Sequence, residues 1–478
     1  MNFKLVFNVT GKVLLLEAVF LLFPMLTALI YGEPLTPFLL TLCILLPVGL
    51  ILSRLPYQKH FYAREGFFTV GLIWVLMGLG GALPFYFSGY FRSFVDCAFE
   101  CFSGFTTTGA TILTDIEILP RGILFWRSLT HWMGGMGVLV LTTAILPTMG
   151  LRSHYLTQAE STGPVASKLV PKQSKTSKIL YGFYCAFTVL EIVALKLAGM
   201  PLYDCFIHTF STAGTGGFSI YNRSIGAYND PVIELIIVVF IILFSINFSL
   251  YFLLLLRRFR DVARSDELRF FLGAVGLSTV LVAINVYPMY RSALQSLRYS
   301  LFQVVSIIST TGFCTADYVH WPVFSQVIIA LLMLCGACAG STGGGLKSAR
   351  IVLCFRCLGR EIRRIVHPRS VSVVKLDGKV VEEDDLRATL GFVCCTFLIV
   401  LGATLVVSLD DLPFATSFSA ALTCINNVGP GLELIGPSGN FSIFSDLSKL
   451  VLSACMVIGR LEIFPILVLL SRDAWRRT

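Results

Sequence analysis

Four short clusters decide how this chain folds: Thr107-Thr108-Gly109-Ala110, Thr215-Gly216-Gly217-Phe218, Thr310-Thr311-Gly312-Phe313 and Asn427-Val428-Gly429-Pro430. The third-position glycines are separated by 108, 95 and 117 residues, so a unit of about one hundred residues recurs four times. A half-apolar segment too short to cross a bilayer lies ahead of each cluster: Phe94–Phe105, Leu202–Ala213, Leu297–Ser309 and Pro413–Cys424. This pattern predicts that each unit consists, in order, of a helix, a short pore helix, an extended loop and a second helix.

The composition is that of a membrane protein. Of 478 residues, 55% are hydrophobic and 14% are charged, whereas about 25% are charged in a soluble domain. Since a bilayer core needs roughly 20 apolar residues per helix, the sequence predicts an all-α protein with ten transmembrane helices. The ten spans are Val13–Tyr31, Leu35–Ser53, Gly66–Phe87, Ile123–Leu146, Ile179–Met200, Val232–Leu256, Phe270–Tyr287, Pro322–Leu358, Ala388–Val407 and Leu447–Leu470.

Lysine and arginine are distributed unevenly among the connections. Alternate connections, beginning with the N-terminus, hold 28 of the 37 Lys and Arg residues. The positive-inside rule places that side in the cytoplasm, together with both termini. Each unit then makes two full crossings, so the four units are parallel around an axis normal to the membrane. The net charge of +9 is read as this topology signal and not as a nucleic-acid-binding surface.

The residue types in the four clusters suit an ion filter. A dehydrated cation needs oxygen ligands, which rings of backbone carbonyls supply in K⁺-selective filters. Glycine reaches the unusual backbone angles that such a loop requires, and non-helical backbone survives at membrane depth only where it is buried or lines a cavity. Gly and Thr are also common packing residues in transmembrane helices, which is the alternative reading. The repetition favours a K⁺-binding filter built from all four clusters.

Two pore helices carry an acid near their start. Asp96 and Asp204 each lie 13 residues before the filter glycine of their unit, where a carboxylate complements the positive end of the helix dipole. Tyr299 and Thr416 occupy the equivalent positions in the third and fourth units. The C-terminal ends of these helices would point at the pore and favour a cation.

The second helix of the third unit is interrupted by Gly340-Ser341-Thr342-Gly343-Gly344-Gly345-Leu346-Lys347-Ser348. This run is not a phosphate-binding P-loop, because Leu346 stands where the lysine should follow the last glycine. A flexible break below the filter is interpreted as a gate, with a simple kink or helix end as the alternative.

Several ionisable residues fall within apolar spans. Arg460 lies in the last span and is expected to face the protein interior, either against carbonyls freed at the Gly-rich break or as an interhelical tie. Glu462 cannot face it on one helix. For five other residues the sequence favours structural pairing or snorkelling over transport: Glu17, Arg127, His131, Glu191 and Lys196. The 14 cysteines lie mostly in apolar spans and suggest neither disulfides nor a metal site, the Cys335–Cys338 pair included.

These motifs resemble those of a known family. The four clusters, the run from Trp126 through His131 to Gly137, and Gly459–Glu462 are similar to the Trk/Ktr/HKT superfamily of cation transporters; the two additional N-terminal spans favour the TrkH/TrkG group of bacterial K⁺-uptake subunits. The resemblance covers essentially the whole chain. It implies one pore per protomer in a homodimer, a gating loop at Gly340–Gly345 and a pore-facing Arg460.

The resemblance also implies K⁺ selectivity, because members with glycine in all four loops are usually K⁺-selective and serine in the first loop goes with Na⁺. It implies a cytosolic, nucleotide-binding TrkA-type partner. This chain has no dinucleotide-binding fingerprint, so a nucleotide would bind to that partner and no cofactor to this chain, apart from K⁺ in the filter. Asn427 and Pro430 depart from the Thr pattern and make the filter an imperfect four-fold ring.

The sequence divides into five parts: an N-terminal two-helix domain at 1–62, then pore units at 63–150, 151–260, 261–375 (with the Gly-rich gating loop) and 376–478. The predicted function is K⁺ uptake across the bacterial inner membrane, and not catalysis, because no convergent set of catalytic groups is present. The alternative is a secondary transporter for another cation or a small solute, for which inverted repeats would be expected. Such a transporter would couple the flux to H⁺ or Na⁺ as a symporter.

Overall fold

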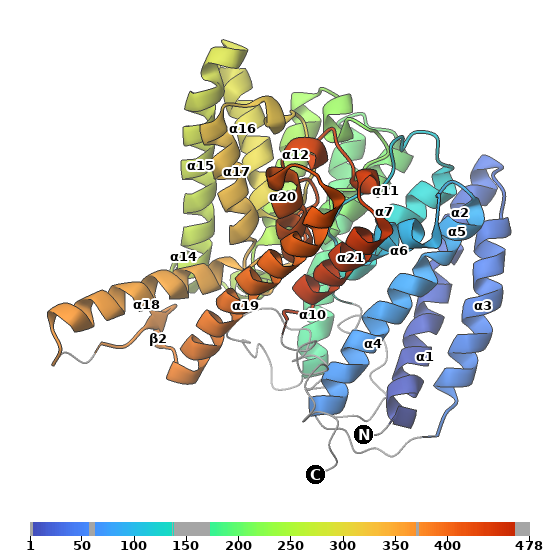
Figure 1. The fold of residues 1–478 in the computed structure, drawn as a ribbon, viewed down its shortest axis with the longest axis horizontal. Coiled ribbons are helices and arrows are strands. Elements are labelled where there is room, and N and C mark those ends of the chain that lie inside the picture. Colours follow the sequence, from blue (N-terminus) through green and yellow to red (C-terminus); the bar gives the residue numbers. More distant parts are fainter. Residues whose placement is uncertain (1–2, 57–62, 136, 138–172, 370–371, 464–478) are drawn as a thin grey trace.

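A computed structural model describes residues 3–56, 63–135, 137, 173–369 and 372–463 of the chain (Figure 1). These residues are helical except for connecting loops and one two-stranded antiparallel hairpin, β1 (Lys375–Leu376) and β2 (Lys379–Val380). The helices of the first half are α1 (Phe3–Phe20), α2 (Leu22–Tyr31), α3 (Thr36–Ser53), α4 (Ala63–Gly81), α5 (Leu83–Ser88), α6 (Phe94–Phe105), α7 (Arg121–Gly135), α10 (Gln173–Leu197) and α11 (Leu202–Gly214).

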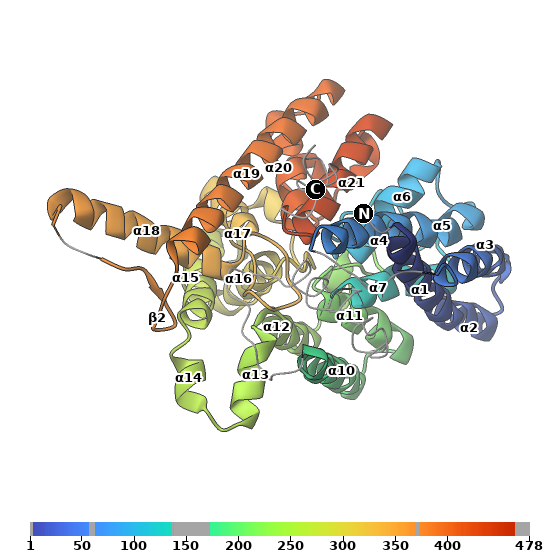
Figure 2. The same ribbon diagram turned by 90° about the horizontal axis from the view of Figure 1, so that it is seen from below.

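The second half of the chain continues the helical pattern. Its α-helices are α12 (Pro231–Ser245), α13 (Phe248–Leu255), α14 (Phe259–Ala263), α15 (Asp266–Tyr290), α16 (Ala293–Ile308), α17 (Val323–Cys335), α18 (Ser348–Val366), α19 (Glu383–Val407), α20 (Phe414–Asn426) and α21 (Asp446–Arg460). Short 3-10 turns are η2 (Ser224–Ala227), η3 (Tyr318–His320), η4 (Ser408–Asp410), η5 (Glu433–Ile435) and η6 (Phe441–Ile443). Helices α1 to α5 lie together at one side, and α18 projects from the opposite side (Figure 2).

Within the described residues, six helices are long and apolar enough to cross a membrane, or seven if one bent pair counts as a span. The six are Phe3–Tyr31, Thr36–Ser53, Gly66–Ser88, Lys178–Leu197, Asp266–Tyr290 and Glu383–Asp410. Two predicted spans, Ile123–Leu146 and Leu447–Leu470, extend beyond the described residues. Their described parts form α7 and α21.

The predicted continuous span Val232–Leu256 is wrong. Helix α12 stops at Ser245 and α13 restarts at Phe248, with the two axes bent by 90°. Asn247 causes the restart, because its backbone is not helical and its side-chain oxygen accepts a hydrogen bond from Ser249 N at 2.9 Å. An asparagine in this place is a helix N-cap. The mean hydropathy does not reveal it, because the surrounding residues are apolar.

The predicted interruption of span Pro322–Leu358 is present and is longer than expected. Helix α17 ends at Cys335 and α18 begins at Ser348, so residues 336–347 are not helical. We call these residues the Gly-rich loop. Gly336, Gly340 and Gly345 have φ angles of +72°, +69° and +78°, which a residue with a side chain rarely adopts.

The four short helices α6, α11, α16 and α20 correspond to the predicted pore helices. Three of them begin within one residue of the predicted start, whereas α16 begins four residues earlier, at Ala293. The reason is Ser292, whose side chain accepts a hydrogen bond from Gln295 N and caps the helix.

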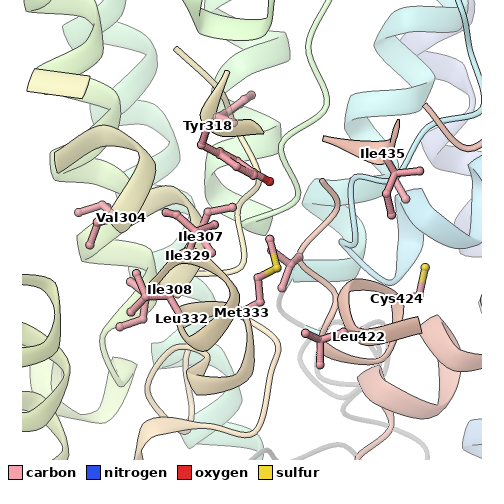
Figure 3. Close-up of a cluster of buried hydrophobic side chains, with 14 of the residues drawn as sticks. Val304, Ile307, Ile308, Tyr318, Ile329, Leu332, Met333, Leu422, Cys424 and Ile435 are labelled. Carbon is pink, nitrogen blue, oxygen red and sulfur yellow. The ribbon is translucent and has the colours of Figure 1, made fainter. Parts of the chain in front are cut away.

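A hydrophobic core packs the third and fourth units together. Figure 3 shows Ile307, Ile308, Leu332, Met333 and Leu422 meeting between α16, α17 and α20. Tyr318 is fully buried above them, and its hydroxyl donates to Gly431 O at 2.9 Å. This bond joins the segment after the third loop to the segment after the fourth, so the core holds the two loops in a fixed relation.

Candidate functional site

All four cluster loops adopt the same backbone conformation. The third-position glycines Gly109, Gly217, Gly312 and Gly429 have φ angles of +80°, +79°, +79° and +98°. Two residues earlier, each loop has a second left-handed residue, this time with a side chain: Thr107, Thr215, Thr310 and Asn427, with φ between 54° and 62°. Left-handed threonine is strained, and three of the four loops have one at this position, with an asparagine in the fourth.

The four loops close into a ring. A Cβ atom built on each glycine would collide with the backbone of the next loop, at the carbonyl of the residue before the next glycine. The four approaches are Gly109 to Gly216 O at 1.9 Å, Gly217 to Thr311 O at 2.1 Å, Gly312 to Val428 O at 2.4 Å and Gly429 to Thr108 O at 2.6 Å. Each loop thus contacts the following one and the fourth contacts the first. We call these four residues the glycine ring.

A cavity of roughly 110 Å³ lies against the glycine ring. All four ring glycines line it, together with polar residues from the segments that follow the loops, among them Asn222 and Asn440. The ring is therefore reachable from a polar hollow and is not sealed inside the core.

The side chains that support the loops differ from unit to unit. Thr106 Oγ1 and Thr108 Oγ1 are 2.8 Å apart behind the first loop, and Ser309 Oγ and Thr311 Oγ1 are 2.7 Å apart behind the third. In the fourth loop, Asn427 Nδ2 donates to Thr108 Oγ1 at 2.9 Å and to Met456 O at 3.0 Å. Asn427 therefore fastens the fourth loop to the first, so this departure from the Thr pattern has a structural use.

Arg127 supports the second loop from α7. Its Nε donates to Glu100 Oε1 at 2.6 Å, its Nη1 donates to Ser219 O at 3.0 Å, and its Cζ lies 3.5 Å from the centre of the Phe218 ring. His131, one turn further along α7, stacks on the same ring with centroids 4.1 Å apart. Phe218 and Ser219 directly follow Gly217, so these contacts fix the backbone that leaves the ring.

The Glu100–Arg127 pair gives a first prediction. Both side chains are at most 2% exposed, so Arg127→Met should lower the free energy of unfolding by about 3–5 kcal/mol, because it leaves the Glu100 carboxylate buried without its cation. The double variant with Glu100→Gln should recover much of the loss. The measurement is thermal or denaturant unfolding in detergent, with Arg258→Met of the exposed Arg258–Asp261 pair as a control that changes stability by at most about 1 kcal/mol. Equal losses at both sites would contradict the assignment.

The acids at the starts of the pore helices are partnered. Asp96 Oδ1 accepts a hydrogen bond from Lys449 Nζ of α21 at 2.6 Å, and Asp204 Oδ2 accepts one from the Tyr228 hydroxyl at 2.6 Å. Thr416, the equivalent residue of the fourth unit, donates to Glu433 Oε2 at 3.0 Å. The start of α20, which has no acidic residue of its own, thus has the Glu433 carboxylate beside it.

The Gly-rich loop is inserted into the break between α12 and α13. Cys338 N donates to Ser245 O at 3.1 Å and Thr342 N donates to Phe244 O at 3.3 Å, while Phe248 N donates to Gly340 O at 3.1 Å. The end of α12 and the start of α13 leave backbone groups without helical partners, and the loop supplies them. Two interrupted helices from neighbouring units therefore satisfy each other.

The same loop lies directly against the third and fourth cluster loops. Gly344 N donates to Thr310 Oγ1 at 2.6 Å. Cβ atoms built on Gly343 and Gly344 would lie 2.8 Å from Ser309 O and 2.6 Å from Asn426 O. There is thus no space for side chains between the loop and the ends of the pore helices.

Arg460 holds the Gly-rich loop from α21. Its Nη1 donates to Thr342 O at 2.9 Å, and its Nη2 donates to Gly134 O and, at 2.7 Å, to Gly135 O. The expectation that Arg460 pairs with carbonyls of the broken segment is confirmed by these contacts. Glu462 pairs instead with Arg350 at the start of α18, whose Nη1 donates to Leu346 O at 3.3 Å.

The other ionisable residues singled out in the sequence lie apart from the ring. Glu17 is fully buried beside Gly80 and Gly81 of α4. Glu191 is buried and Lys196 is exposed in the last turn of α10. Sequence reasoning passed over Glu100, Glu267, Arg350 and Lys449, whose roles depend on partners distant in sequence. The sequence signal that could have identified them is an acidic or basic residue at the edge of an apolar span.

Comparisons with known proteins agree with this architecture. The sequence profile of the TrkH family, described as a cation transport protein, matches residues 39–475. The chain is 38% identical to the Trk system potassium uptake protein TrkH of Salmonella typhimurium and 37% identical to that of Escherichia coli K12, with 100% of both chains covered in each case. The crystal structure of the potassium transporter TrkH from Vibrio parahaemolyticus matches over 100% of both chains, with 34% identity and a TM-score of 0.88.

These matches extend over the whole chain and include a solved structure. The resemblance inferred from the four clusters is therefore confirmed, and the reading of the chain as a transporter and not an enzyme is confirmed with it. The fold is that of a multi-pass membrane protein. The chain belongs to the TrkH family of cation transport proteins.

Proposed function

We propose that this protein takes up K⁺ across the bacterial inner membrane through the ring of four loops. The closed glycine ring is the observation that carries the proposal. Its four loops share two left-handed positions, so their backbones follow one path and present carbonyl groups in equivalent places. Carbonyl oxygens that replace the water of a dehydrated cation are the ligands of K⁺ filters. The names of the relatives, Trk system potassium uptake proteins, support K⁺ as the cargo.

The first determinant of the proposed filter is the glycine ring itself. The loops bearing Gly109, Gly217, Gly312 and Gly429 would bind the ion through their backbone carbonyls, and the pore helices would point their negative C-terminal ends at it. Asp96 and Asp204 at the opposite ends of α6 and α11 fit that orientation. The cavity beside the ring would be the outer entrance.

The Gly-rich loop is the proposed gate. It contacts the filter loops at Thr310, and Arg460 holds it at Thr342. A non-helical segment that is pressed against the filter and is held by individual side chains can be displaced without unfolding a helix. The orientation with cytoplasmic termini, homodimerisation and regulation by a TrkA-type nucleotide-binding subunit complete the proposal; they rest on the Lys and Arg distribution and on the family.

Ion flux in liposomes tests the proposal. The purified protein should carry K⁺ and Rb⁺ into liposomes well ahead of Na⁺ and Li⁺, because a ring of fixed carbonyls matches the larger dehydrated ions. A regulatory partner would be added if the protein alone is silent. Flux without K⁺ preference, or flux driven only by a proton or Na⁺ gradient, would favour a coupled transporter for another solute.

A further inference from the structure

Glu267 lies in the first turn of α15 and bonds both to the Gly-rich loop and to the start of α18. The side chain is buried, and its Oε1 atom accepts a hydrogen bond from Ala339 N at 2.6 Å and another from Ala349 N at 3.1 Å. Ala339 lies in the Gly-rich loop just before Gly340, and Ala349 is the second residue of α18. One carboxylate oxygen therefore closes the segment between them into a bridged loop.

The bond to Ala349 also places a negative charge at the start of α18. The first backbone N–H groups of a helix have no partner within the helix, and an anion there is stabilised by the helix dipole. Hydrogen bonds to a carboxylate are roughly twice as strong as those between neutral groups. Glu267 is thus attached to the loop at one end and to a helix that continues from it at the other.

The neighbouring acid, Asp266, connects the same helix start to the hairpin. Its Oδ2 accepts hydrogen bonds from Arg356 Nη1 and from Asp377 N, both at 2.8 Å, and its own N–H donates to Asp377 Oδ1 at 2.7 Å. Asp377 forms the turn between β1 and β2. The hairpin and the Gly-rich loop are therefore bound to consecutive residues of one helix.

We infer that Glu267 is a positioning residue that holds the Gly-rich loop against the filter, and that Asp266 links this hold to the β1–β2 hairpin. The inference rests on the proposed function, since it assigns the loop as the gate. Both bonds to Glu267 are made in this structure, which we assign to the closed arrangement of the gate. Displacement of the loop requires that Ala339 or Ala349 leave the carboxylate, so a shift of the hairpin that moves the start of α15 changes how firmly the gate is closed.

Hydrogen exchange and flux together test the role of Glu267. In the full-length protein, Glu267→Ala should speed amide exchange in peptides covering residues 336–349 and raise basal Rb⁺ flux about tenfold, equal to about 1.4 kcal/mol. Glu267→Gln keeps an accepting oxygen without the charge and should produce a smaller rise in both. The K⁺ over Na⁺ preference should not change, because the glycine ring is untouched. Glu382→Gln, an exposed acid at the start of α19, is the matched control.

The outcomes separate the inference from the proposed function. If Glu267→Ala leaves loop exchange and flux at the wild-type level while the protein remains K⁺-selective, the inference is wrong and the gate proposal stands. If the wild type shows no K⁺ preference, the proposed function fails, and the exchange measurement still decides whether Glu267 holds the loop. Should the alanine variant not fold, Glu267→Gln carries the test. Asp266→Asn should speed exchange in the loop as well as in the hairpin; a change confined to the hairpin overturns the link.

Discussion

Gly109→Ser should lower the preference for K⁺ over Na⁺ about tenfold or more. A Cβ at this position would lie 1.9 Å from Gly216 O, which no packing adjustment of a side chain can relieve, because the obstacle is backbone. The φ angle of +80° adds strain, and a strained residue of this kind costs of order 1–3 kcal/mol. Either the first or the second loop must move, and the spacing of the carbonyls changes with it. A difference of 1.4 kcal/mol between two ions is a factor of ten.

The measurement is the ratio of Rb⁺ to Na⁺ flux into liposomes, with Gly402→Ser as the matched control. Gly402 lies in α19 with open space where a Cβ would be, so the same substitution there should leave the ratio unchanged. Gly312→Ser should act like Gly109→Ser, since its Cβ would meet Val428 O at 2.4 Å. A ratio that is insensitive to both ring substitutions would remove the four loops as the filter.

Arg460→Gln should raise basal flux about tenfold by weakening the hold on the Gly-rich loop. The guanidinium donates to three carbonyls, and a hydrogen bond that involves a charged group contributes about 1.5–3 kcal/mol. Of these three bonds, the one to Thr342 O reaches the loop, so the loss of that bond sets the scale of the effect. Arg460→Lys keeps the charge without the planar fork and should give an intermediate flux.

The same liposome assay measures this effect, and an unchanged K⁺ preference shows that the filter is intact. Arg223→Gln, at an exposed arginine directly before η2, serves as a control and should leave flux unchanged. Reduced flux in Arg460→Gln at normal protein yield would contradict a closing role. It would indicate that the arginine helps the ion to pass.

The sequence alone predicted the loops better than the helices that surround them. One left-handed position in each of the four loops is occupied by a glycine that the sequence shows directly: Gly109, Gly217, Gly312 and Gly429. These positions could be predicted because backbone strain is local and depends on the type of residue at the strained position. The bend at Asn247 was missed because hydropathy averages over a window and one polar residue among apolar ones barely changes it. Its capping role becomes clear only from the non-helical backbone at Asn247 in the structure.

The contacts that fasten the loops could not be predicted for a different reason. Glu267 meets Ala339 and Ala349, 72 and 82 residues further along the chain, and Asn427 meets Thr108 at a separation of 319. No periodicity connects such pairs, because they arise from the packing of complete units. The contact between Arg460 and the Gly-rich loop is the exception, because it could be predicted from the sequence. A charge inside an apolar span needs buried partners, and a helix break exposes carbonyls that can accept hydrogen bonds from it.

The insertion of the Gly-rich loop into the α12–α13 break has a consequence for biosynthesis. Thr342 reaches Phe244 O across 98 residues of chain, so the carbonyls at the end of α12 have no permanent partner until most of the third unit has been translated. Unpaired carbonyls are costly in lipid, and the nascent second unit must therefore stay hydrated or shielded by the insertion machinery until the loop emerges. A ribosome stalled before residue 336 should leave a second unit that is sensitive to protease near Asn247. One stalled far enough beyond α18 for the loop to have left the ribosome should not.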